Sequence, residues 1–174
     1  MSAKQRYAQC MEWLYIGCVV LSGTALVVIT LIIPLGVFMR YSMNSPLSWP
    51  EPASVIMMVM FSFLGGAAVY RANVHVAVEA LLNAVSPKVR RAMLWGVDAC
   101  MGATALFMLF YGIQLCWVTQ YSTMAEFPSV SQAAVYLPIP IAGFLTLLFL
   151  IERIWVGDPP KTSIMYTDQA SELE

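Results

Sequence analysis

The side chains best suited to chemistry in this sequence are one histidine and one glutamate four residues apart. His75 and Glu79 would lie on one face of a helix, a spacing that two ligands of a metal ion can use. No third ligand accompanies them, and a hydrogen bond on a helix surface explains the spacing better. The four cysteines show no CxxC spacing. We therefore predict no metal site and no disulfide.

Catalytic motifs are also missing. A catalytic site needs several convergent polar groups, but the sequence has a single histidine and no nucleophile elbow or phosphate loop. We expect no enzymatic activity and no cofactor. One alternative is a haem-anchoring subunit of a redox complex, although such an anchor would normally use two histidines. Another alternative is an independent small transporter that uses Glu51 or Asp98.

The composition is that of a membrane protein. Of 174 residues, 60% are hydrophobic and only 11% are charged, whereas about 25% charged residues is usual in soluble domains. A net charge of −1 gives no electrostatic support for binding nucleic acid. We predict an all-α integral membrane protein, with one four-helix domain over residues 1–157 and a polar tail over 158–174. Four apolar stretches predict its transmembrane helices: Leu14–Met39 and, approximately, 53–70, 94–118 and 133–156.

Proline and capping residues indicate where these helices bend or begin. Pro34 should bend the first helix near its end. Ser48 and Glu51 have the spacing of a capping box for the second helix, where a carboxylate is stabilised by the helix N-terminus. Pro138 and Pro140 should kink the fourth helix or delay its start, because each removes a backbone donor.

Two further positions have more than one interpretation. Gly65 and Gly66 are followed by two alanines, so the last turns of the second helix can approach another helix closely, in this chain or in a partner. Asp98 lies one turn inside the third helix. Its carboxylate would either face a partner or water, or favour the first turns of its helix.

Between the second and third helices lies a segment with helical periodicity that is too short to span a membrane. We predict an amphipathic arm there, which ends near Pro87 and lies flat in the lipid headgroup region or docks on a partner. His75, Glu79 and Asn83 fall on its polar face. Its apolar face consists of Val74, Val78, Leu81, Leu82 and Val85.

The distribution of lysine and arginine predicts the topology. With four spans, eight of the nine cationic residues fall on one side of the membrane, and Arg40 lies on the other. Cytoplasmic loops carry such an excess of positive charge, so both termini are expected in the cytoplasm. The eight residues are Lys4, Arg6, Arg71, Lys88, Arg90, Arg91, Arg153 and Lys161.

An ordered set of motifs now becomes recognisable over roughly residues 15–156. It resembles the small membrane subunit of tripartite ATP-independent periplasmic (TRAP) transporters, the DctQ-like family. The family often has a second acidic residue directly after Glu51, where this chain has Pro52, so a role that needs both carboxylates is in doubt. The motifs are Arg40-Tyr41, Trp49 with Glu51, FLGGAA at 63–68, then Arg71, His75, Val76 and Glu79, and YLPIPIAGF at 136–144.

The resemblance implies a set of partners and a role. The chain would form a stable heterodimer with a large membrane subunit in the bacterial inner membrane and brace it among the membrane lipids. A periplasmic binding protein would deliver an organic acid transiently, and a sodium gradient would drive uptake. A C4-dicarboxylate, a sialic acid, another sugar acid and a keto acid all remain open as substrates. The implied interface with the large subunit consists of Arg40, Trp49, Glu51, Gly65, Gly66, Arg71, His75 and Glu79.

Overall fold

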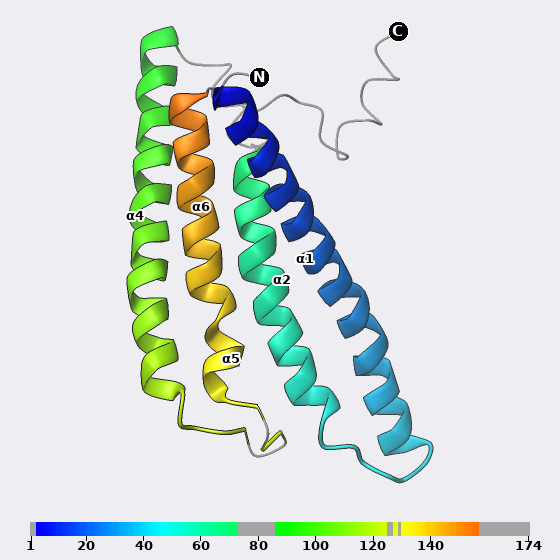
Figure 1. Cartoon of the computed structure of the whole chain (residues 1–174). Helices are drawn as coiled ribbons and strands as arrows, with labels where there is room; N and C mark the ends of the chain where they lie inside the picture. The colour runs from blue at the N-terminus through cyan, green and yellow to red at the C-terminus, as the bar shows by residue number, and fades with distance from the viewer. Residues whose placement is uncertain (1–2, 73–85, 125–126, 129, 157–174) are drawn as a thin grey trace, which may run out of the picture.

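The protein is built from long helices (Figure 1). The structure, a computed structural model, describes residues 3–72, 86–124, 127–128 and 130–156. Three helices and the combined α5–α6 segment are each long and apolar enough to cross a membrane, so the predicted all-α fold with four transmembrane helices is confirmed. The predicted arm and tail lie outside the described residues. The helices are α1 (Ala3–Tyr41), α2 (Pro50–Ala72), α4 (Pro87–Thr119), α5 (Gln132–Tyr136) and α6 (Pro138–Trp155).

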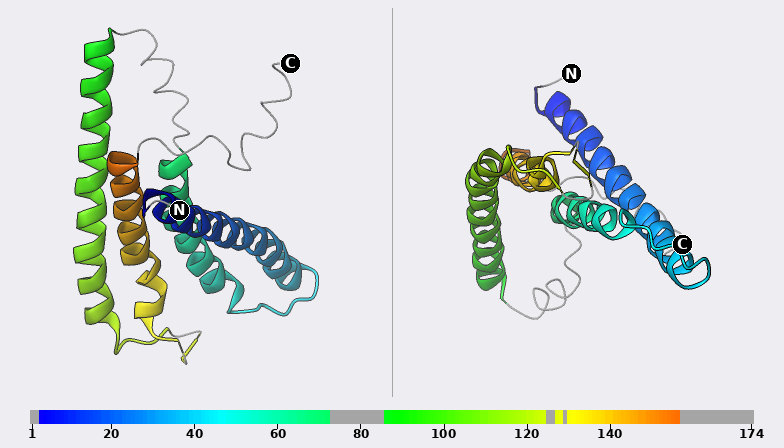
Figure 2. Two further views of the ribbon diagram at one scale, coloured as in Figure 1. Left: turned by 45° about the horizontal axis from the view of Figure 1, so that its top comes forward. Right: turned by 90° about the horizontal axis from the view of Figure 1, so that it is seen from below.

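The four long helices stand in a row, in the order α4, α6, α2, α1 (Figure 1). Seen from below, the row is curved, and α1 leads away from it at an angle (Figure 2). Long helices that follow one another along the chain run in opposite directions, so α6 and α2, which are neighbours in the row, run in the same direction. One end of the molecule, which we call the Arg71 end, therefore holds the starts of α1 and α4 and the ends of α2 and α6. The opposite end holds the loops that follow α1 and α4.

Helix α1 extends well beyond the stretch predicted to span the membrane. It begins at Ala3 rather than near Leu14, because Tyr7 and Met11 in its first turns pack against the core. The absence of charge marks the part of a helix that suits lipid, and it does not mark where the helix begins. With 39 residues, α1 is about 58 Å long, nearly twice the hydrocarbon thickness of about 30 Å.

The predicted interruption of the fourth span is confirmed. The short helix α5 ends at Tyr136, and α6 begins at Pro138. Pro138 and Pro140 thus occupy the first turn of α6, where a missing backbone N–H breaks no helical hydrogen bond. Ser131 caps α5, since its hydroxyl accepts a hydrogen bond from the backbone N–H of Ala133 at 3.2 Å.

The start of α2 differs in part from expectation. Because α2 begins at Pro50, Ser48 lies one residue too early to cap it, so the capping-box prediction for Ser48 is wrong. Trp49 takes the position directly before the helix. Pro34 lies inside α1, which continues to Tyr41.

The hydrophobic core lies at the Arg71 end, where α1, α2 and α6 meet. Beyond this core, each helix presents apolar side chains on its outer face, as expected where lipid or a partner helix covers it. The core residues are Met11, Tyr15 and Cys18 of α1, Leu64, Ala67, Ala68 and Tyr70 of α2, and Ala142, Leu145 and Phe149 of α6.

The tightest glycine contacts lie between α4 and α6. A Cβ atom on Gly143 of α6 would lie 2.8 Å from the carbonyl oxygen of Ala105 and 2.9 Å from the backbone nitrogen of Leu109. By contrast, a Cβ on Gly65 would make an ordinary contact of 3.6 Å with Ser22 of α1, and one on Gly66 would meet nothing within 4 Å. Within this chain, Gly143 therefore needs to be glycine more than Gly65 or Gly66 does.

Candidate functional site

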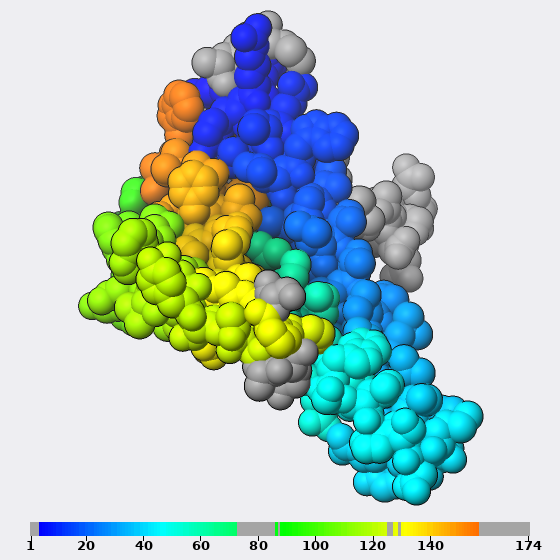
Figure 3. Space-filling view, turned by 60° about the horizontal axis from the view of Figure 1, so that its bottom comes forward, coloured from blue at the N-terminus to red at the C-terminus, as the bar shows by residue number. Residues whose placement is uncertain are grey.

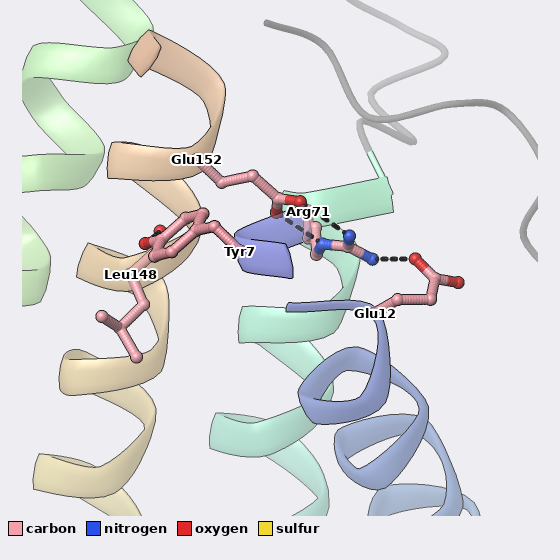
Figure 4. Close-up of polar contacts among 5 residues, drawn as sticks. All are labelled: Tyr7, Glu12, Arg71, Leu148 and Glu152. Atoms are coloured by element: carbon pink, nitrogen blue, oxygen red, sulfur yellow. Dashed lines mark hydrogen bonds and ion pairs between the residues drawn. The ribbon is translucent and has the colours of Figure 1, made fainter. Parts of the chain in front are cut away.

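Arg71 in the last turn of α2 is the centre of an ion-pair cluster (Figure 4). Its Nε donates to Oε2 of Glu152 at 2.7 Å, and its Nη2 donates to Oε1 of the same carboxylate at 2.9 Å. Its Nη1 donates to Oε2 of Glu12 at 2.6 Å. Glu152 belongs to α6 and Glu12 to α1, so one guanidinium joins three helices.

The cluster is largely removed from solvent. The side chain of Arg71 is 5% exposed and that of Glu152 is 2% exposed, whereas Glu12 remains 38% exposed. A buried charge is costly unless it is paired with good geometry, and the bidentate contact between Arg71 and Glu152 meets this condition. Two carboxylates around one guanidinium leave a net charge of −1, which the partly exposed Glu12 keeps near water.

The surrounding helices explain why these residues meet. The small residues Ala67 and Ala68 let α2 approach its neighbours closely. The guanidinium carbon of Arg71 then lies 5.2 Å from the ring centre of Tyr15 and 5.6 Å from that of Phe149, distances typical of cation–π contacts. An arginine also suits the C-terminal end of a helix.

A second polar cluster links α4 to the same end of the row. Nη1 of Arg153 lies 3.2 Å from Oδ1 of Asp98, and the hydroxyl of Tyr70 donates to the same oxygen at 3.2 Å. Asp98 therefore pairs with groups of its own chain. Because α4 begins at Pro87, Asp98 lies about three turns inside its helix rather than one. The interpretation in which it favours the first turns of its helix is wrong. Arg71 belongs to the first cluster, and the adjacent residue Tyr70 belongs to the second.

Tyr7 adds a neutral contact beside these charges. Its hydroxyl donates to the backbone carbonyl oxygen of Leu148 at 3.1 Å (Figure 4). Its ring meets that of Trp155 edge-on, with 5.8 Å between the ring centres. The start of α1 is thereby fastened to the last turns of α6, at the end where the ion pairs also lie.

Three of the residues predicted from the motifs lie far from Arg71, at the opposite end. Arg40, at the end of α1, donates to Oε1 of Glu51 in the first turn of α2 at 2.7 Å. Both side chains are exposed, so this pair contributes little to stability. Trp49 directly precedes α2 and is partly exposed. These three residues form a polar patch beside the α1–α2 loop.

The predicted arm lies outside the described residues. It comprises His75, Glu79 and Asn83 with Val74, Val78, Leu81, Leu82 and Val85. Among those that are described, no group of three or more His, Cys, Asp or Glu side chains could hold a metal ion.

Sequence reasoning missed Glu12, Glu152 and Arg153 as members of a site. Each was present as an ionisable residue beside an apolar stretch, and such residues are rarely left without a partner. That rule identifies them as members of pairs. It does not identify the pairing, because the partners of Arg71 are separated from it by 59 and 81 positions.

The family model for the DctQ component of tripartite ATP-independent periplasmic transporters matches residues 29–158. This chain belongs to that family. It is also 26% identical, over 135 residues, to the "Putative TRAP transporter small permease protein" of Haemophilus influenzae, which covers 78% of this chain and 83% of that protein. The predicted resemblance is confirmed, and the chain is a multi-pass protein of the inner membrane from a family of transporter permeases.

Proposed function

We propose that this DctQ-type chain braces the large transport subunit of a TRAP transporter and carries no substrate itself. The observation that carries this proposal is the use of the mostly buried charges. Arg71, Glu152, Asp98 and Arg153 hold helices of the same chain together. A transport pathway needs ionisable groups that face a ligand or water near the middle of the membrane. These groups instead stiffen one end of a scaffold.

The open row of helices supports the same role. Among the described residues, only α6 and α2 have a long helix on each side, and α4 lies at one edge of the row (Figure 2). Its outer face carries large aromatic side chains that are suited to packing against a partner's helices or lipid. They are Phe107, Phe110, Tyr111 and Trp117.

In this proposal the Arg71 end faces the cytoplasm, and the patch of Arg40, Trp49 and Glu51 faces the periplasm. The excess of lysine and arginine at the Arg71 end supports this orientation. The complete complex takes up an organic acid that a periplasmic binding protein delivers, and a sodium gradient drives the uptake. Its substrate is set by the binding protein and the large subunit.

Co-purification tests the partnership. The gene for the large subunit is expressed together with this chain carrying an affinity tag. We expect the two proteins to elute together in one-to-one ratio in mild detergent, as a stable heterodimer. An unrelated tagged four-helix membrane protein, expressed with the same large subunit, is the control. Recovery of the large subunit no better than with the control would contradict the proposal.

The rival candidate is a small transporter that works alone through Glu51 or Asp98. In the structure, Glu51 pairs with Arg40 in an exposed position, and Asp98 pairs with Arg153. Neither carboxylate lies in the middle of its helix, which disfavours the rival. The redox-anchor alternative finds no support in the family match, because the family is one of transporter components.

A further inference from the structure

An apolar groove lies between α1 and the α5–α6 segment, where no other long helix in the described part of the chain fills the space. It has a volume of about 390 Å³, and Met60 and Leu64 of α2 line it from between the two walls. Figure 3 shows α2 in the gap between α1 and α5. Nearly all of the lining surface is apolar, including Gly17 on the α1 side and Ile141 on the α6 side. A ligand of this groove must therefore be apolar.

A flexible hydrocarbon chain suits the groove better than a helix. A helix is about 10 Å across with its side chains, whereas a hydrocarbon chain is narrower and can follow the groove from Trp13 to Leu137.

A positive charge near one end of the groove indicates which kind of molecule carries the hydrocarbon chain. Trp13 lines the groove and is 76% exposed. Arg6, also exposed, precedes Trp13 by two helical turns, or about 10 Å, and therefore lies on the same side of α1. A cationic side chain and an indole N–H at the membrane interface complement the phosphate of a phospholipid.

We propose that the groove binds one acyl chain of a membrane phospholipid, with the phosphate held beside Arg6 and Trp13. The lipid fills the space that opens as α1 diverges from α6, and so it becomes part of the wall of the molecule. This inference does not depend on the proposed partnership, because every residue in it belongs to this chain.

Gly17 allows a direct test. A Cβ on Gly17 would meet nothing within 4 Å, and Gly17 lines the groove, so Gly17→Phe should place its ring in the groove. Gly23→Phe is the matched control, since Gly23 lies on the same helix, also has open space around it, and does not line the groove. The full chain is reconstituted in vesicles that contain phosphatidylglycerol with a photoactivatable group on one acyl chain.

We expect cross-links to concentrate on groove residues such as Met60, Leu64 and Ile141. Labelling there should fall several-fold in Gly17→Phe and stay at the wild-type level in Gly23→Phe. Gly17→Leu, a smaller filler, should give an intermediate loss. Thermal unfolding of each variant shows whether it is folded, and if Gly17→Phe is not, the comparison rests on Gly17→Leu.

The phosphate contact is tested with two probes that share the same acyl chain. Arg6→Glu should lower labelling of the groove by phosphatidylglycerol and leave labelling by diacylglycerol, which has no phosphate, unchanged. Even labelling around all outer faces, or full labelling in both Gly17 variants, would overturn the proposal. So would labelling of the isolated chain that disappears when the large subunit is present, because the groove would then belong to a partner helix.

Discussion

At the scale of single residues, the stability of the described fold depends most on Arg71. Removing one member of a buried ion pair is strongly destabilising, because the other member is left as an unpaired charge. The guanidinium serves two carboxylates on two different helices. Its loss would leave Glu152, which is 2% exposed, without a cation.

We therefore predict that Arg71→Ala lowers the stability of the chain by about 3–5 kcal/mol. Arg71→Lys should lose part of this amount, because an ammonium group cannot reproduce the two-pronged contact with Glu152. Arg40→Ala is the control, since its exposed pair with Glu51 is worth at most about 1 kcal/mol. The measurement is thermal or denaturant unfolding in one detergent. Equal stability of Arg71→Ala and Arg40→Ala would show that the cluster does not hold the helices.

The pairing partners of individual residues were the part of the site that the sequence predicted least well. Arg71 was singled out through its motif as part of an interface with the large subunit, and its two carboxylate partners in the same chain, Glu12 and Glu152, were not foreseen. Asp98 was left with two interpretations. In both cases the pairing depends on the order in which the helices stand side by side, and no local pattern encodes that order.

At the scale of the helices, the contact between α4 and α6 is predicted to be the least tolerant of bulk. A side chain at Gly143 would collide with backbone atoms of Ala105 and Leu109, and backbone cannot move aside cheaply. Gly143→Leu should therefore destabilise the chain by about 3 kcal/mol, the upper end of the range of about 1–3 kcal/mol that overpacking typically costs. Gly96→Leu in α4 is the control, because it has open space around it. Unfolding temperatures decide the question, and indistinguishable values would contradict the packing shown here.

A substitution at Gly66 can test assembly with the large subunit apart from folding of this chain. Because a Cβ there meets nothing in this chain, Gly66→Leu should leave the unfolding temperature close to that of the wild type. If its exposed face packs against the large subunit, as the family resemblance implies, the same variant should markedly lower the yield of co-purified large subunit. Gly23→Leu, in equally open space on α1, serves as the control. Normal co-purification of Gly66→Leu would exclude Gly66 from the interface.

The existence of the helices was predictable and their ends were not. Four apolar stretches gave the four spans, and Pro138 with Pro140 gave the break before α6. The first turns of α1, which carry Lys4, Arg6 and Glu12, look too polar to be part of a span. They are nevertheless helical, because Tyr7 and Met11 reach α6 and the core. Tertiary contacts, rather than lipid, set the length of α1.

At the scale of the whole molecule, the topology stays a prediction with a direct test. The four native cysteines are replaced by serine or alanine, and one cysteine is introduced by Lys4→Cys or by Ser122→Cys. In intact spheroplasts, an impermeant thiol reagent should label Ser122→Cys and leave Lys4→Cys unlabelled. Permeabilised cells, in which both should react, are the control. The reverse pattern would place the Arg71 end outside the cell and contradict the charge argument.

The central claim is that this chain supports transport without performing it. The direct measurement is uptake of a radiolabelled organic acid into proteoliposomes with an inward sodium gradient and the binding protein outside. Vesicles with both membrane subunits should accumulate the acid, and vesicles with either subunit alone should not. In vesicles with both subunits, Arg71→Ala should reduce uptake, because weaker contacts among α1, α2 and α6 make this chain a less rigid support for the large subunit. Uptake by the small chain alone, at a rate close to that of the complete system, would contradict this account.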